Sequence, residues 1–185
     1  MLSLVVLWLL LAIAAATDIA RQEIYNWTTY SGAAAGLALS YAGFGLFPPG
    51  IEGGMAAALG FLACGFIMLT AFVFFEVGGG DVKMMAMIGA YLGVQRGIEV
   101  LLWTFSIGFV VGIAIVIWQT GIAKLVRKTI EHARLVITTR HWVPLTETER
   151  KPLKRGLFLA PSALAATSIV AWQVLREFWD AIGNA

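Results

Sequence analysis

The chain has 185 residues, of which 59% are hydrophobic and only 13% are charged, with a formal net charge of +2. Soluble domains of this size carry about a quarter charged residues, so the composition excludes a soluble globular protein and indicates a membrane protein with about six helical spans. The single cysteine, Cys64, excludes a disulfide framework or a cysteine-rich zinc site within one chain.

Apolar runs separated by polar, glycine-rich or proline-rich breaks predict the spans in chain order. The first run lacks the basic residues that precede a secretory signal peptide, so we interpret it as a retained span. The fourth run is short, and we expect it to be tilted or enclosed by protein. The spans are expected at about residues 2–18, 28–47, 54–76, 82–94, 98–118 and 156–175. The prediction is an all-α, polytopic membrane protein with a single membrane-embedded domain over residues 1–185.

The basic residues predict how the chain is oriented in the membrane. With the N-terminus outside, 11 of the 13 lysines and arginines fall in the connections that face the cytoplasm, as the positive-inside rule requires. We therefore expect both termini on the periplasmic or extracellular side of the inner (cytoplasmic) membrane. The same topology brings Asp18, which ends the first span, and Asp81, which begins the fourth, to the cytoplasmic face.

The most polar part of the chain is the segment 119–155, with nine basic and three acidic residues. Apolar residues at near-helical spacing in its first half predict an amphipathic helix on the inner leaflet, bound to anionic lipid. A direct contact with substrate is the alternative. His132 and His141 have no cysteine partners and match no zinc-site spacing, so no metal site is expected. Nucleic acid is not an expected partner, because the basic residues follow the membrane face.

Three acidic residues, Asp18, Glu76 and Asp81, lie at or near membrane depth. An ionisable group there is costly, so a function is the first hypothesis for each. The structural alternative for Asp81 is a helix N-cap. A structural role is a weaker alternative for Asp18, because a negative charge at the C-terminal end of a helix is unfavourable to the helix dipole. For Glu76, the structural alternative is that it is a polar residue at the membrane interface, where the third span ends.

Two carboxyl groups at one membrane face suggest a pair that shares a proton. Like charges a few ångströms apart do not both ionise easily. One carboxylate can then take a proton from water while the other, still protonated, donates to a scissile carbonyl. Such a pair would hydrolyse an amide without a metal or other cofactor. Glycine has no side chain, so Gly78, Gly79 and Gly80 would let an extended peptide approach Asp81.

Two stretches carry a resemblance to a known family. "GGGDVKMMAMIGAYLG" resembles the GxGD signature of the prepilin peptidases, and "DIARQEIYNW" resembles the segment around their first aspartate. The resemblance implies a GxGD aspartyl protease bundle with Asp18 and Asp81 as the catalytic pair. It also implies that Gly78 and Gly80 are motif glycines and that Lys83 matches a lysine common after GxGD.

Further expectations follow from this resemblance. Tyr25 stands where the family often has proline, so Asn26 is expected only to support the turn after Asp18. Glu76 is a candidate contact for the basic leader of the substrate. Because paired CxxC motifs are absent, the chain resembles the short forms that serve Flp (tight-adherence) pili, which would cleave prepilin precursors without N-methylation. An archaeal preflagellin peptidase is a related alternative.

A function from another class also fits the acidic residues. A small transporter component could use Asp18, Glu76 and Asp81 to bind a cation or relay protons. The sequence does not distinguish the individual precursor or the oligomeric state.

Overall fold

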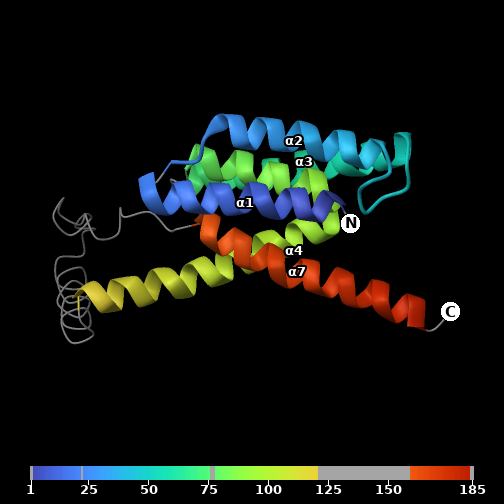
Figure 1. Ribbon diagram of the computed structural model, residues 1–185. Coiled ribbons are helices and arrows are strands. Elements are labelled where there is room, and N and C mark those ends of the chain that lie inside the picture. The colour runs from blue at the N-terminus through green and yellow to red at the C-terminus, as the bar shows by residue number, and fades with distance from the viewer. Residues whose placement is uncertain (1, 22, 76–77, 121–158, 184–185) are drawn as a thin grey trace. The chain divides into compact units, whose positions relative to one another are not determined.

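The structure, a computed structural model, describes residues 2–21, 23–75, 78–120 and 159–183 (Figure 1). Every element among these residues is an α-helix, which confirms the all-α prediction. The helices are α1 (Leu2–Arg21), α2 (Asn26–Tyr41), α3 (Ile51–Phe75), α4 (Gly79–Thr120) and α7 (Leu159–Gly183). The described residues 108–120 belong to a second unit, so the packing below concerns residues up to 107 and the helix α7.

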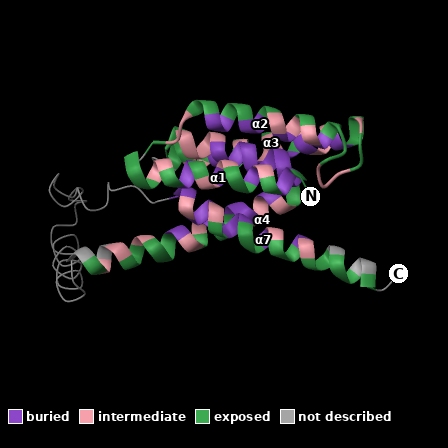
Figure 2. Ribbon diagram, viewed as in Figure 1, coloured by how far each residue is buried: buried purple, intermediate pink, exposed green. Residues whose placement is uncertain are grey.

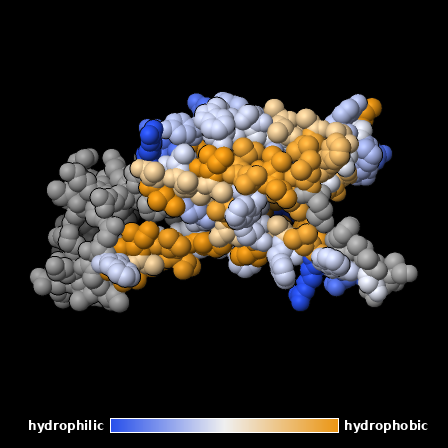
Figure 3. Space-filling view, viewed as in Figure 1, coloured by the Kyte–Doolittle hydropathy of each residue, from blue (hydrophilic) through white to orange (hydrophobic). Residues whose placement is uncertain are grey.

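Within the described residues, three helical segments are long and apolar enough to cross a membrane: Leu2–Arg21, Ile51–Phe74 and Gly79–Ile115. Large apolar side chains remain on the surface, among them Phe66, 72% exposed, and Phe74, 74% exposed. Figure 3 shows apolar side chains over much of the middle of the face in view. A soluble protein would not expose so much apolar surface, and the chain is a polytopic membrane protein. The expected number of six spans stays a prediction.

The helix α4 contains a sharp reversal at Gly93, where φ is 75° and ψ is −174°. A side chain added at Gly97 would come within 3.3 Å of Gly89 Cα, although residues eight apart in a straight helix are about 12 Å apart. The chain therefore folds back at Gly93. The sequence placed this break at Gln95-Arg96-Gly97, slightly too late.

The half of α4 before the reversal is the centre of the core. Every residue from 84 to 93 is buried (Figure 2), as expected of a helix that is apolar on all sides. Its length of about 21 Å is less than the ~30 Å hydrocarbon core of a bilayer. The sequence-based expectation of a short helix enclosed by protein agrees with this.

Glycines allow the neighbouring helices to approach this core helix closely. On α2, a side chain at Gly36 would collide with the ring of Tyr91, 2.8 Å away. On α3, a side chain at Gly60 would collide with the backbone of Gly89 and Gly93. Small residues at such contacts are typical of helix packing in membranes, where close van der Waals contact replaces the hydrophobic effect.

The helices α1 and α7 pack antiparallel. Trp8 Nε1 donates a hydrogen bond to Ser168 Oγ at 3.1 Å, and ten residues further along α1 Asp18 contacts the start of α7. The N-terminus of α1 and the C-terminus of α7 therefore lie at the end of the bundle opposite Asp18 (Figure 1). Near that opposite end, Arg96 of α4 forms an ion pair with Glu177 of α7 at 2.7 Å.

Two helix boundaries differ from prediction by more than five residues, and two predictions concern residues that the structure does not describe. The helix α2 ends at Tyr41, before the expected residue 47, and α7 continues to Gly183, past the expected residue 175. Glu76 and nearly all of the basic segment 119–155, including His132 and His141, lie outside the described residues.

Candidate active site

Asp18 lies in the last turn of α1, and its carboxylate accepts a hydrogen bond from the backbone N–H of Ala160 at 3.3 Å. Ala160 is in the first turn of α7, where backbone N–H groups lack partners within the helix. A negative charge is favourable at a helix N-terminus. The charge that opposes the dipole of α1 is thus stabilised by α7, a contact between residues far apart in the sequence.

Asp81 lies in the first turn of α4, directly after the glycines. Its backbone N–H donates to the carbonyl oxygen of Gly78 at 3.1 Å. Its carboxylate lies beside the Gly78 backbone, because a Cβ added at Gly78 would be 2.9 Å from Asp81 Oδ2. A negative charge in the first turn of a helix is favourable, so Asp81 stabilises this helix start while its carboxylate oxygens keep acceptor positions available to a ligand.

Both carboxyl groups line one cavity of about 440 Å³. They are close enough for the charge of Asp18 to act on Asp81. The remaining walls come from the turn between α1 and α2 and from the glycines before Asp81. These lining residues are Glu23, Ile24, Tyr25, Asn26, Gly78, Gly79 and Gly80. The structure thus brings together all of the sequence-predicted site residues in the described part of the chain except Lys83.

Lys83 lies beside this cavity and is joined to it through Asn26. Its Nζ donates to Asn26 Oδ1 at 2.8 Å and lies 5.0 Å from the centre of the Tyr30 ring. Asn26 is the first residue of α2, so the hydrogen bond ties the start of α2 to the first turns of α4. The sequence assigned Asn26 to support of the turn and gave Lys83 no definite role.

Sequence reasoning missed several features of the cavity. Arg21, the basic residue nearest Asp18 in sequence, donates to the Tyr25 hydroxyl rather than pairing with Asp18. Ile24 packs against Gly80, where an added side chain would come within 3.1 Å of Ile24 Cβ. The sequence does indicate that these residues lie near Asp18, because only a short turn joins the end of α1 to the start of α2. Residues in so short a turn must lie at the same end of the bundle as Asp18. The contact with α7 had no local signal.

The arrangement offers two carboxyl groups at the ends of helices, in a cavity that is open to water and bordered by backbone without side chains. That combination can position a water molecule and a peptide carbonyl between an acid and a base. Among the described residues, no three histidine, cysteine, aspartate or glutamate side chains are grouped as ligands for a metal ion.

Comparison with known proteins agrees with the geometry. The model of the type IV leader peptidase family matches residues 4–113, which is more than half of the chain and includes Asp18, the glycines and Asp81. Neither the curated proteins nor the solved structures gave a match. The chain therefore belongs to the type IV leader peptidase family and is a prepilin peptidase, an aspartic protease of the membrane.

Proposed function

We propose that Asp18 and Asp81 are the catalytic pair of this peptidase. The observation that carries the proposal is their position: the two carboxyl groups come from helices far apart in sequence, yet line one cavity and interact electrostatically. Neither has a basic side chain bonded to it among the described residues. In the described part of the chain, the Asp18 carboxylate accepts a backbone hydrogen bond from Ala160, and the Asp81 carboxylate lies beside the Gly78 backbone.

The reaction would proceed by general acid–base catalysis. The ionised carboxylate takes a proton from water, whose oxygen attacks the scissile carbonyl carbon. The protonated carboxyl group donates its proton to the carbonyl oxygen, giving a tetrahedral diol. Collapse of the diol breaks the C–N bond as the leaving nitrogen takes a proton from the first carboxyl group, and the second takes one back from the diol hydroxyl. Both groups return to their starting states.

The glycines would keep the approach to Asp81 free. A Cβ at position 78 would lie 2.9 Å from Asp81 Oδ2, so any side chain there displaces the carboxylate or occupies the place of the substrate. A Cβ at position 79 would be no closer than 3.9 Å to any atom outside its own turn. We infer that Gly78 is required by the carboxylate, whereas position 79, the variable position of the GxGD motif, has room for a small side chain.

The finer features of the activity are also proposals. The enzyme would cleave the basic leader from Flp-type prepilins or prepilin-like precursors at the cytoplasmic membrane face, with both termini of the chain on the other side. The distribution of basic residues supports this orientation. Cleavage without N-methylation is proposed from the resemblance of the chain to the short forms of the family.

Conservative substitution of each aspartate tests the catalytic assignment. Asp18→Asn and Asp81→Asn each keep size and hydrogen-bonding capacity but cannot exchange a proton. We expect each to reduce cleavage of a co-expressed Flp-type prepilin at least about a thousandfold, measured as the loss of the faster-migrating product on a gel. The amount of enzyme in the membrane should not change.

The matched control is Glu99→Gln, which removes an acid of α4 outside the cavity and should leave cleavage unchanged. Shortening of the precursor by both aspartate variants at the normal rate would contradict the catalytic assignment. Normal processing combined with altered ion flux would favour the transporter hypothesis.

A further inference from the structure

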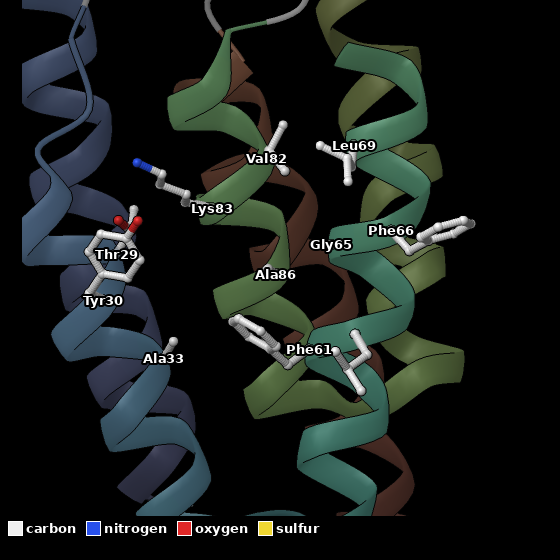
Figure 4. A pocket seen from close by; sticks show the side chains of 11 residues that line it. Thr29, Tyr30, Ala33, Phe61, Gly65, Phe66, Leu69, Val82, Lys83 and Ala86 are labelled. Carbon is white, nitrogen blue, oxygen red and sulfur yellow. The ribbon is translucent and has the colours of Figure 1, made fainter. Parts of the chain in front are cut away.

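A second cavity opens beside the candidate active site, and its lining is apolar rather than acidic. This apolar groove, of about 310 Å³, lies between α2 and α3 with the first half of α4 as its floor (Figure 4). It is lined by Thr29, Tyr30, Ala33, Phe61, Leu62, Gly65, Phe66, Leu69, Val82, Lys83 and Ala86. Lys83 is its one charged lining residue and extends from α4 toward α2.

The groove adjoins the carboxylate cavity through consecutive residues. Asp81 lines the polar cavity, whereas Val82 and Lys83 line the groove. The hydrogen bond from Lys83 to Asn26 crosses between them, because Asn26 lines the polar cavity. A chain lying in the groove with one end near Lys83 would reach Asp81 within a few residues.

The floor of the groove fits a helix better than it fits irregular lipid chains. One small residue from each of the three helices is present: Ala33 of α2, Gly65 of α3 and Ala86 of α4. A side chain at Gly65 would come within 3.1 Å of Ala86 Cβ, so the floor is already closely packed. In membranes, helices associate where small residues let backbones approach and larger ones surround the contact, as Phe61 and Phe66 do here.

From the apolar lining of the groove and its position beside Asp81, we propose that it binds an apolar helical segment of the precursor next to the scissile bond, while the bond itself lies in the carboxylate cavity. The inference rests on the proposed function and deepens it. The two cavities would together recognise a boundary between a polar and an apolar stretch. Cleavage specificity would then depend on the position of that boundary relative to Lys83.

Site-specific photocrosslinking tests occupancy of the groove. A photoreactive phenylalanine analogue replaces Phe66 in the groove or Phe74 on another face of α3; the two side chains are 72% and 74% exposed, so they are matched in type and accessibility. In an Asp81→Asn background that retains uncleaved prepilin, we expect the precursor to crosslink at position 66 at least several-fold more than at position 74. Equal crosslinking at both positions, or products containing only lipid or a second enzyme chain at position 66, would overturn the proposal.

Enzyme kinetics provide a second test of the groove proposal. In reconstituted vesicles, the double variant Leu62→Ala/Phe66→Ala should raise the KM for full-length precursor about tenfold with little change in kcat, as expected when binding common to ground state and transition state is lost. A water-soluble peptide with the leader and scissile bond but without the apolar segment should be cleaved equally by the variant and the wild type. Phe74→Ala should leave both substrates unaffected.

The two proposals fail in different ways. If wild-type enzyme cleaves both substrates but the groove variant has an unchanged KM for the precursor, the groove proposal is wrong and the catalytic assignment stands. If the Asp18→Asn and Asp81→Asn variants still cleave while position 66 crosslinks selectively to the cleaved product, which keeps the apolar segment, the groove proposal stands and the catalytic pair is wrong.

Discussion

At the scale of single residues, each aspartate of the cavity has a structural contact as well as a proposed chemical role. Asp18 accepts a hydrogen bond from the first turn of α7, and the Asp81 carboxylate lies beside the backbone of Gly78, just before α4. The sequence alone left a cap and a catalytic group as alternatives for Asp81. The geometry allows both, because a carboxylate has two oxygens and about four acceptor positions.

The two roles of Asp18 can be separated by substitution. Asp18→Asn keeps an oxygen acceptor for the Ala160 N–H, whereas Asp18→Ala removes it. We expect Asp18→Ala to lower the free energy of unfolding by about 1 kcal/mol more than Asp18→Asn, the usual cost of losing a helix cap. Thermal unfolding in detergent measures this difference. Both variants should be equally inactive, and equal stability would show that the contact with α7 contributes nothing.

The hydrogen bond between Lys83 and Asn26 connects the cavity to the groove. Lys83→Met and Asn26→Ala each remove it, so their effects on the cleavage rate should not add. We expect a coupling energy of about 1 kcal/mol in a double-mutant cycle, with partial recovery in Lys83→Arg, which keeps a charged donor. Additive effects would mean that the two side chains act independently of each other.

At the scale of the helices, the reversal at Gly93 ends the short helical segment that carries Asp81 and thereby decides what this segment packs against. Apolar runs in the sequence located every described helix to within several residues, because burial in lipid demands long apolar stretches. They misplaced the reversal because Gln95 and Arg96 read as a polar connection. In the structure Arg96 is helical and pairs with Glu177, while the turn depends on the backbone of Gly93. Neither feature is visible in local hydropathy.

Substitution at Gly93 tests this explanation. Gly93→Ala forces an L-residue into a positive φ of 75° and places its Cβ against the Phe47 ring. We expect a loss of more than about 1–3 kcal/mol in the free energy of unfolding, because a φ of 75° with a ψ of −174° is a conformation adopted almost only by glycine and alone costs that much. The control is Gly50→Ala, where φ is 94° but nothing lies within 4 Å of the added Cβ. It should lose only the backbone part, and an equal loss at both positions would rule out the Phe47 contact.

At the scale of the whole molecule, sequence and structure contribute different parts of the site. The motif residues from Gly78 to Asp81 and the acid at the end of the first span are visible in the sequence, and counting spans predicts that both reach one membrane face. The contact of Asp18 with α7, the position of Lys83 beside Tyr30 and the apolar groove depend on how distant helices pack. Hydropathy carries no information on such contacts, so the sequence could not predict them.

The central claim is that Asp18 and Asp81 meet in one cavity, and their proximity can be measured directly. Since Cys64 is the only cysteine, a Cys64→Ala chain carrying Asp18→Cys and Asp81→Cys offers two unique thiols. A short bifunctional thiol reagent applied to membranes should join them within one chain, detected by mass spectrometry of the linked peptides, while the pair Asp18→Cys and Glu99→Cys should remain unlinked. Absence of the Asp18–Asp81 link, when each thiol alone reacts with a monofunctional reagent, would contradict the account.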